Sequence, residues 1–156
     1  MGPSLATEWR FALLLPLWFA AAAVAVGAYR NVPVLDDWTY AWSVERLLRH
    51  GTFEVLDWSA VYPLGAALWG SAFSWVFGLS FVTLRVSTLV LALAACVALY
   101  FILRELDATP SVALLGAVSV AGNPVFLLLS SSFMTDVPFV AFTLLSLLCY
   151  VRAMRR

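Results

Sequence analysis

The sequence predicts an all-α integral membrane protein, with about four transmembrane helices and one or two extracytoplasmic interfacial helices. Two features of its composition indicate this class. Hydrophobic residues make up 63% of the 156 residues and charged residues only 12%, whereas soluble domains contain about 45–50% apolar and about 25% charged residues. The apolar residues also gather in runs that approach the roughly 20 residues a helix needs to cross a bilayer. Such a chain cannot cover itself with a polar surface.

The first apolar run, residues 11–29 (FALLLPLWFAAAAVAVGAY), follows Arg10 and predicts the first transmembrane helix. A cleaved signal peptide is the alternative, because AVAVGA offers small residues in an arrangement typical of a cleavage site. Both interpretations deliver the residues that follow to the outside of the membrane.

Residues 30–84 form the predicted extracytoplasmic loop, and five of the nine acidic residues lie in it. Within the loop, DDWTYAWSVERLLRHG predicts an amphipathic helix, because apolar residues from Tyr40 to Leu48 recur at helical spacing and Gly51 follows as a stop. Aromatic residues near one end suit the membrane interface. Residues 62–79 contain three glycines and two tryptophans, which favours a second interfacial or partly embedded helix over a true span.

Three further spans are predicted at residues 86–103, 111–129 and 137–151, the second with an internal Asn123-Pro124. With four spans both termini are cytoplasmic, and five arginines lie inside against four outside, in the direction of the positive-inside rule. A fifth span at 62–79 would move Arg104 and the C-terminal arginines outside. The four-span topology places the loop with Asp36 and the SSSFMTD turn on the same, extracytoplasmic side, where they can meet.

Charge and cysteine usage narrow the kinds of partner. The formal net charge is zero, all nine basic residues are arginines, and no basic cluster exceeds the one at the C-terminus. Nucleic-acid binding therefore has no electrostatic basis. Cys96 and Cys149 both lie in apolar runs, which indicates small core or lipid-facing residues rather than a disulfide or a metal site.

Three features can carry chemistry: the pair Asp36-Asp37 after the first span, Arg85 before the second, and Asp136 before the last. Each has a structural alternative, because the aspartates suit helix N-caps and the arginine suits a headgroup anchor. Ionisable groups at the edge of a membrane also tend to mark substrate paths or reaction centres. Carboxylates from two loops, with an arginine for a phosphate, suit sugar transfer from a lipid-phosphate donor.

The order of the motifs resembles the N-terminal part of the polytopic GT-C glycosyltransferases, the group that includes protein O-mannosyltransferases and lipid A aminoarabinose transferases. The first span leads into LDDWTYAWSVERLLRHGTF, like the family's acidic pair with its interfacial helix and glycine. The segments FGLSFVTLRVSTLV and YFILRELDATPSVALLGA follow, and then NPVFLLLSSSFMTDVPFVAF, like the family's Pro-containing span with a Thr-Asp at the next helix start. The resemblance covers residues 11–156.

The resemblance implies an enzyme of the cell membrane, the bacterial inner membrane, with its active side extracytoplasmic. It implies transfer of a sugar from a polyprenyl-phosphate donor to a lipid, glycan or protein acceptor. Asp36 matches the family's catalytic base and Asp37 its acidic partner. Asp136, Arg85 and Tyr40 are the expected substrate-binding residues, Arg85 at the donor phosphate. No cofactor is implied with certainty, and a divalent metal stays open.

Two departures from the family qualify this expectation. Some relatives carry Lys-Pro-Pro before the aromatic segment, whereas this chain reads SAVYPLGAALWG there and contains no lysine. Family members usually have many more spans, so the chain is expected to be a fragment of a longer enzyme. The alternative is a non-catalytic small polytopic membrane protein or subunit, in which the aspartates are caps. A transporter fragment ranks last, because the predicted spans hold no ionisable residue at mid-depth.

Overall fold

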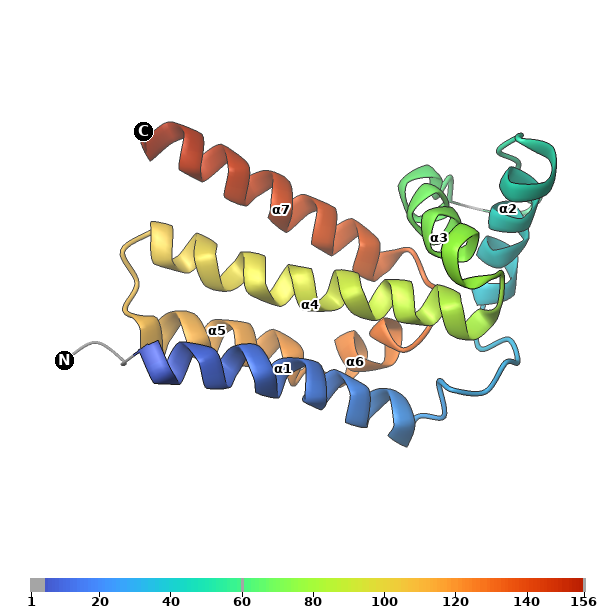
Figure 1. The fold of residues 1–156 in the computed structure, drawn as a ribbon. Coiled ribbons are helices and arrows are strands. Elements are labelled where there is room, and N and C mark those ends of the chain that lie inside the picture. The colour runs from blue at the N-terminus through green and yellow to red at the C-terminus, as the bar shows by residue number, and fades with distance from the viewer. Residues whose placement is uncertain (1–4, 60, 156) are drawn as a thin grey trace.

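The computed structural model describes residues 5–59 and 61–155, with side chains from residue 14 onward, and this part of the chain is helical without any strand. The helices lie roughly side by side, except for two that sit together at one end (Figure 1). In chain order they are α1 (Leu5–Ala25), α2 (Asp37–His50), α3 (Leu64–Phe77), α4 (Phe81–Glu105), α5 (Pro110–Ala121), α6 (Pro124–Ser130) and α7 (Asp136–Arg155).

The central element is α4, which contacts every other helix. Figure 1 shows α7 along one side of it and α1 with α5 along the other. The middle of α4 presents small side chains, and Ala92, Ala95 and Cys96 are fully buried. Small residues allow helix backbones to approach closely, and here they receive Phe19 of α1 and Ala141 of α7 in one core cluster.

Length and apolar character confirm the predicted class. The helices α4 and α7 are each long and apolar enough to cross a membrane, and the pair α5–α6 would be a third span if it crosses as one bent unit. The predicted spans 86–103 and 137–151 lie within α4 and α7. The apolar segments Leu14–Ala25 and Leu64–Phe77 are shorter. The protein is therefore an all-α membrane protein.

The predicted span at 111–129 corresponds to two helices, because the chain bends by 65° between α5 and α6 at the Asn123-Pro124 that the prediction placed inside it. The break lies at Gly122 and Asn123. Pro124 has no N–H to continue the ladder and disfavours a helical conformation in the residue before it. Asn123 adopts an extended conformation, and its side chain accepts hydrogen bonds from the N–H groups of Val125 (2.9 Å) and Phe126 (3.1 Å). These bonds cap a new helix in place of the continuing one.

The two helices at one end of the bundle agree with the expected loop helices. Helix α2 ends at Gly51, which has a φ of +71° and whose N–H bonds to the carbonyl of Leu47, as the glycine predicted. Helix α3 has 14 residues and therefore rises about 21 Å, less than the roughly 30 Å of a hydrocarbon core. The short length of α3 favours the predicted position at the membrane interface, which stays a prediction.

A glycine on α3 fixes how the loop helices dock on the bundle. A Cβ at Gly70 would lie 2.7 Å from Cζ of Phe133 and 3.0 Å from Cδ2 of Leu84. Phe133 belongs to the turn between α6 and α7, and its side chain is buried against Ala67, Leu84 and Val44. Only a glycine leaves room for this ring. The contact holds the α6–α7 turn against α2 and α3.

The opposite end of the bundle is closed by ion pairs. Arg152 near the end of α7 bonds to Glu105 at the end of α4 (3.0 Å), and Arg155 pairs with Asp107 in the α4–α5 turn. The first loop and the α6–α7 turn lie at the other end, with α2 and α3 (Figure 1).

Candidate functional site

The first loop and the α6–α7 turn meet at Tyr40, as the four-span topology predicted. The Tyr40 hydroxyl is hydrogen-bonded to the side chain of Thr135, the residue before α7. Tyr40 also lies within electrostatic range of Asp36 and Asp136. Residues about a hundred positions apart in the sequence therefore face one another, and three of the expected site residues share one place.

Tyr40 stays a neutral phenol at physiological pH. Burial is the main cause that raises its pKa above the ordinary value of 10.0, and the negative charges of Asp36 and Asp136 raise it further. The hydrogen bond with Thr135 opposes these effects. A protonated hydroxyl within electrostatic range of two carboxylates can donate or accept a hydrogen bond, so Tyr40 suits the positioning of a hydroxylated substrate.

The two adjacent aspartates have different environments. Asp37 is fully buried, and both of its oxygens are engaged. Its Oδ1 accepts a bond from the backbone N–H of Val34 (2.8 Å), and its Oδ2 accepts two bonds from Arg85, from Nε (3.1 Å) and Nη2 (2.7 Å). Asp36 is exposed, and its carboxylate makes no hydrogen bond or ion pair within the described part of the chain. Of these two aspartates, only Asp36 presents a free carboxylate.

Neither aspartate caps α2 in the ordinary way. Asp36 occupies the N-cap position, but its side chain makes no capping bond. The preceding Leu35 has a φ of +56°, a left-handed conformation that bulky residues rarely adopt and that costs about 1–3 kcal/mol. The bonds between Asp37 and Val34 close this turn. The turn directs Asp37 inward and leaves Asp36 outside, so the N-cap explanation does not account for Asp36.

Arg85 organises the loop that carries this pair. It lies in the second turn of α4, is 1% exposed, and commits all five N–H groups to protein acceptors. Besides Asp37, the acceptors are three backbone carbonyls of the first loop: Ala28 (3.4 Å), Arg30 (2.7 Å) and Val32 (2.5 Å). No N–H remains for a donor phosphate, so the geometry argues against the expected phosphate contact. Arg85 instead ties the chain after α1 to α4.

Asp136 begins α7 and lines a groove between that helix and the start of α3. The groove has a volume of about 400 Å³, and its polar lining comes from Tyr62, Thr135 and Asp136, whereas Phe139 and Phe142 supply an apolar wall. Asp136 is exposed and unpaired in the described residues. Its carboxylate is stabilised by the positive end of the helix dipole. A ligand with polar and apolar parts fits such a groove.

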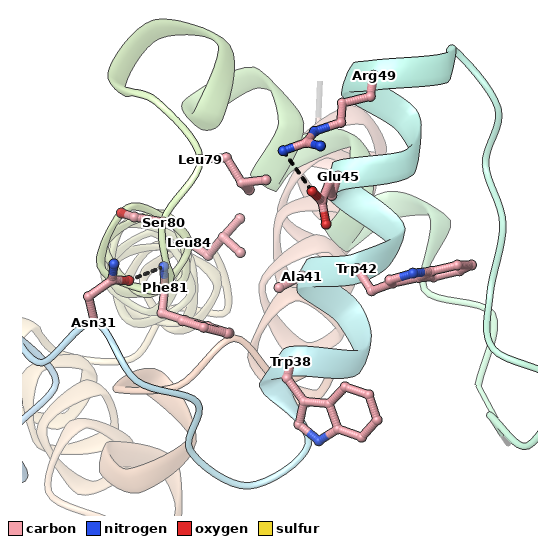
Figure 2. A pocket seen from close by; sticks show the side chains of 10 residues that line it. All are labelled: Asn31, Trp38, Ala41, Trp42, Glu45, Arg49, Leu79, Ser80, Phe81 and Leu84. Atoms are coloured by element: carbon pink, nitrogen blue, oxygen red, sulfur yellow. Dashed lines mark hydrogen bonds and ion pairs between the residues drawn. The ribbon is translucent and has the colours of Figure 1, made fainter.

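A second groove, of about 410 Å³, lies between α2 and the start of α4 (Figure 2). Its polar groups are largely engaged with one another. Arg49 pairs with Glu45 at 2.9 Å, and Asn31 accepts a bond from the N–H of Phe81 at 2.9 Å. Figure 2 marks both contacts with dashed lines among the residues that line the groove. None of the five predicted site residues lines it, and we place the site at Tyr40 rather than here.

Two features of this site go beyond the predicted residues. Thr135 bonds to Tyr40, and its only signal in the sequence was its place just before Asp136 at a helix start. The Gly70–Phe133 contact, which packs the α6–α7 turn against α3, had no local signal in the sequence. Across residues 5–59 and 61–155, no three His, Cys, Asp or Glu side chains converge as a metal site would need.

Comparison with protein-family models gives a match over the second part of the chain. A family model described as dolichyl-phosphate-mannose-protein mannosyltransferase matches residues 56–156. No curated protein and no solved structure matches the chain. The matched range contains Arg85, Thr135 and Asp136, and it begins after Asp36, Asp37 and Tyr40.

Proposed function

The chain belongs to the dolichyl-phosphate-mannose-protein mannosyltransferase family, and from this premise we propose that it transfers a sugar from a polyprenyl-phosphate donor to an acceptor on the extracytoplasmic side of the membrane. The family makes mannose the first sugar to test and a protein the first acceptor. We place the protein in the bacterial inner membrane and treat residues 1–156 as one membrane domain. The observation that carries the proposal is the free Asp36 carboxylate at the junction of the two loops.

Asp36 is the proposed catalytic base. As the acceptor oxygen attacks the anomeric carbon, Asp36 takes the proton of the acceptor hydroxyl, and the bond between that carbon and the phosphate oxygen breaks. The polyprenyl phosphate leaves with the bonding electrons. The exposed carboxylate of Asp36 can reach an incoming hydroxyl, and a positioned base contributes about 10²- to 10⁴-fold to such a step.

The remaining site residues position the reactants. Tyr40 and Asp136, which lie with Asp36 at one junction, bind hydroxyl groups of the substrate by hydrogen bonds. Asp37 and Arg85 are positioning residues, because they are buried against each other and hold the turn that presents Asp36.

The donor phosphate needs a cation, and Arg30 is our candidate. Arg46, Arg49 and Arg85 on this end of the molecule each pair with a carboxylate, whereas Arg30 makes no ion pair within the described residues. Its guanidinium lies 5.9 Å from the ring centre of Tyr29, just after α1. An arginine just after a membrane helix can reach the phosphate of a membrane lipid with its long side chain.

The experiment replaces Asp36 by asparagine at the chromosomal locus, so that the protein is made in its natural length. Membranes are supplied with radiolabelled polyprenyl-phosphate mannose, and transfer to acceptors is measured. We expect transfer to fall by about 100-fold or more, with unchanged protein level and thermal stability, because Asp36 makes no bond that the substitution breaks. Glu45→Gln, on the other side of α2, is the matched control and should keep transfer within about twofold.

Near wild-type transfer in the Asp36→Asn protein would remove Asp36 as the base. If mannose fails in the wild-type protein as well, the assay is repeated with polyprenyl-phosphate aminoarabinose. Failure of both donors would favour a non-catalytic membrane protein.

A further inference from the structure

Two grooves adjoin at Tyr62, on the end of the molecule that carries the proposed site. The first is the groove between α3 and α7 that Asp136 lines. The second has a volume of about 450 Å³ and is lined by Trp42 and residues 54–57 together with Tyr62. The Tyr62 side chain is 68% exposed and takes part in both linings. We call the two grooves together the Tyr62 trough.

The Tyr62 trough carries uncompensated negative charge. Asp57 and Asp136 are exposed and make no ion pair or hydrogen bond within the described part of the chain. Glu54 differs, because Arg46 (2.7 Å) and Thr52 (2.9 Å) engage its carboxylate. Those bonds hold the pKa of Glu54 below its usual value. No Arg or His side chain lines either groove, so the charges of Asp57 and Asp136 remain for a ligand.

The charge decides which substrate can occupy the trough. A polyprenyl-phosphate donor is anionic, and like charges brought together at an interface oppose binding. The donor is therefore disfavoured here, which leaves the acceptor. Aromatic rings attract cations over their faces. The exposed ring of Tyr62 lines both grooves, whereas the ring of Trp42 already holds the guanidinium of Arg46 at 5.3 Å. Carboxylates and aromatic faces together are a lining that selects positive charge.

We propose that the Tyr62 trough binds the acceptor as an extended peptide segment that carries a Lys or Arg side chain near the hydroxyl that receives the sugar. This inference rests on the proposed function, which makes a protein the first acceptor, and adds that the acceptor carries a basic side chain near its hydroxyl. The hydroxyl lies at the Thr135 and Asp136 end, because Tyr40 and Asp36 are there. The basic side chain reaches the Asp57 end, beyond Tyr62. Two open grooves in a row suit an extended chain better than one compact head group.

The test measures peptide binding without donor. The chain is reconstituted in nanodiscs of neutral lipid, and fluorescent Ser/Thr peptides that differ only in Arg, Gln or Glu near the hydroxyl are titrated by anisotropy. We expect the Arg peptide to bind at least about fivefold tighter than the Gln peptide, and the Glu peptide to bind most weakly. Binding of the Arg peptide should weaken as salt rises, because exposed charges are screened.

Variants locate the interaction. Asp57→Asn should weaken the Arg peptide about three- to fivefold and leave the Gln peptide unchanged, as the loss of one exposed charge contact predicts. The control Glu45→Gln removes a carboxylate that lines neither groove and should change neither peptide. Equal binding of the three peptides, no binding of the Arg peptide, or equal effects of the two substitutions would each overturn the proposal.

The two proposals fail separately. Asp36→Asn should abolish transfer and keep the preference for the Arg peptide, since binding needs no base. A preserved preference without transfer in the wild-type protein would overturn the catalytic proposal alone. Transfer without a preference would overturn the trough alone.

Discussion

The buried pair of Asp37 and Arg85 should be strongly coupled in stability, because neither charge has access to water. Their side chains are 0% and 1% exposed, with Nη2 and Oδ2 2.7 Å apart. Removing one member of such a pair leaves a buried charge without its partner, at a cost of about 3–5 kcal/mol. Asp37→Asn and Arg85→Gln should each lower the free energy of unfolding by about that amount.

The double variant decides whether the pair acts as a unit. It leaves no unpaired buried charge, and its main loss is that of the three carbonyl partners of Arg85, about 1 kcal/mol each. The double variant should therefore be far more stable than the sum of the single changes predicts, with a coupling energy of about 2 kcal/mol or more. Unfolding in mixed micelles, followed by tryptophan fluorescence, measures all four free energies.

The exposed pair of Glu45 and Arg49 provides the matched control. It is an i,i+4 pair at 2.9 Å whose side chains are 36% and 70% exposed. Such pairs contribute about 0.3–0.5 kcal/mol. The same double-substitution cycle should give a coupling near that value. A coupling for Asp37 and Arg85 no larger than that of the control would refute the argument that burial makes this pair the organiser of the loop.

Three further predictions concern the docking, the site and the topology. Gly70→Ala should be less stable than Gly65→Ala by about 1–3 kcal/mol in thermal unfolding. A Cβ at position 70 would lie 2.7 Å from the buried Phe133 ring, whereas a Cβ at position 65 would lie 3.4 Å from the partly exposed Phe142 ring. Equal stability of the two variants would contradict the close contact between Gly70 and Phe133. Since the pKa of Tyr40 is raised, its stabilising effect should be complete below about pH 10 and be lost as pH rises through the raised value, so Tyr40→Phe should flatten the alkaline fall of the unfolding free energy. Asp57→Cys and Leu106→Cys, each alone in a chain without native cysteines, should react with impermeant maleimide from opposite sides of the membrane; reaction from one side would reject the four-span topology.

The elements that could be predicted are those whose signals are local. The end of α2 follows from Gly51, since a glycine alone accepts its φ of +71° without strain. Helices α4 and α7 follow from continuous hydropathy. The α5–α6 bend was missed, although Pro124 was visible, because a proline can kink or break a span. Asn123 decides between these outcomes through its two capping bonds, which depend on the folded backbone.

The site was predictable in its place and less so in its roles. Counting spans was enough to bring Asp36 and Asp136 to one end of the bundle. It could not say which aspartate of the pair is free, because that depends on a left-handed turn at Leu35. The resemblance, in turn, assigned Arg85 to the donor phosphate, which requires a free guanidinium. The four protein acceptors that occupy its guanidinium come from a loop about fifty residues earlier.

Arg85 also explains how one part of the chain can specify another. The family match covers residues 56–156 and so includes Arg85 but not the loop of Asp36. Nevertheless, Arg85 binds the carbonyls of Arg30 and Val32 and the carboxylate of Asp37, and a planar guanidinium with five fixed N–H groups accepts few arrangements of those acceptors. The matched segment therefore imposes a conformation on the loop before it. Both oxygens of Asp37 accept hydrogen bonds in this arrangement, and the strained turn at Leu35 leaves Asp36 exposed. The burial of Asp37 against Arg85 is thus the structural reason why the adjacent Asp36 is exposed.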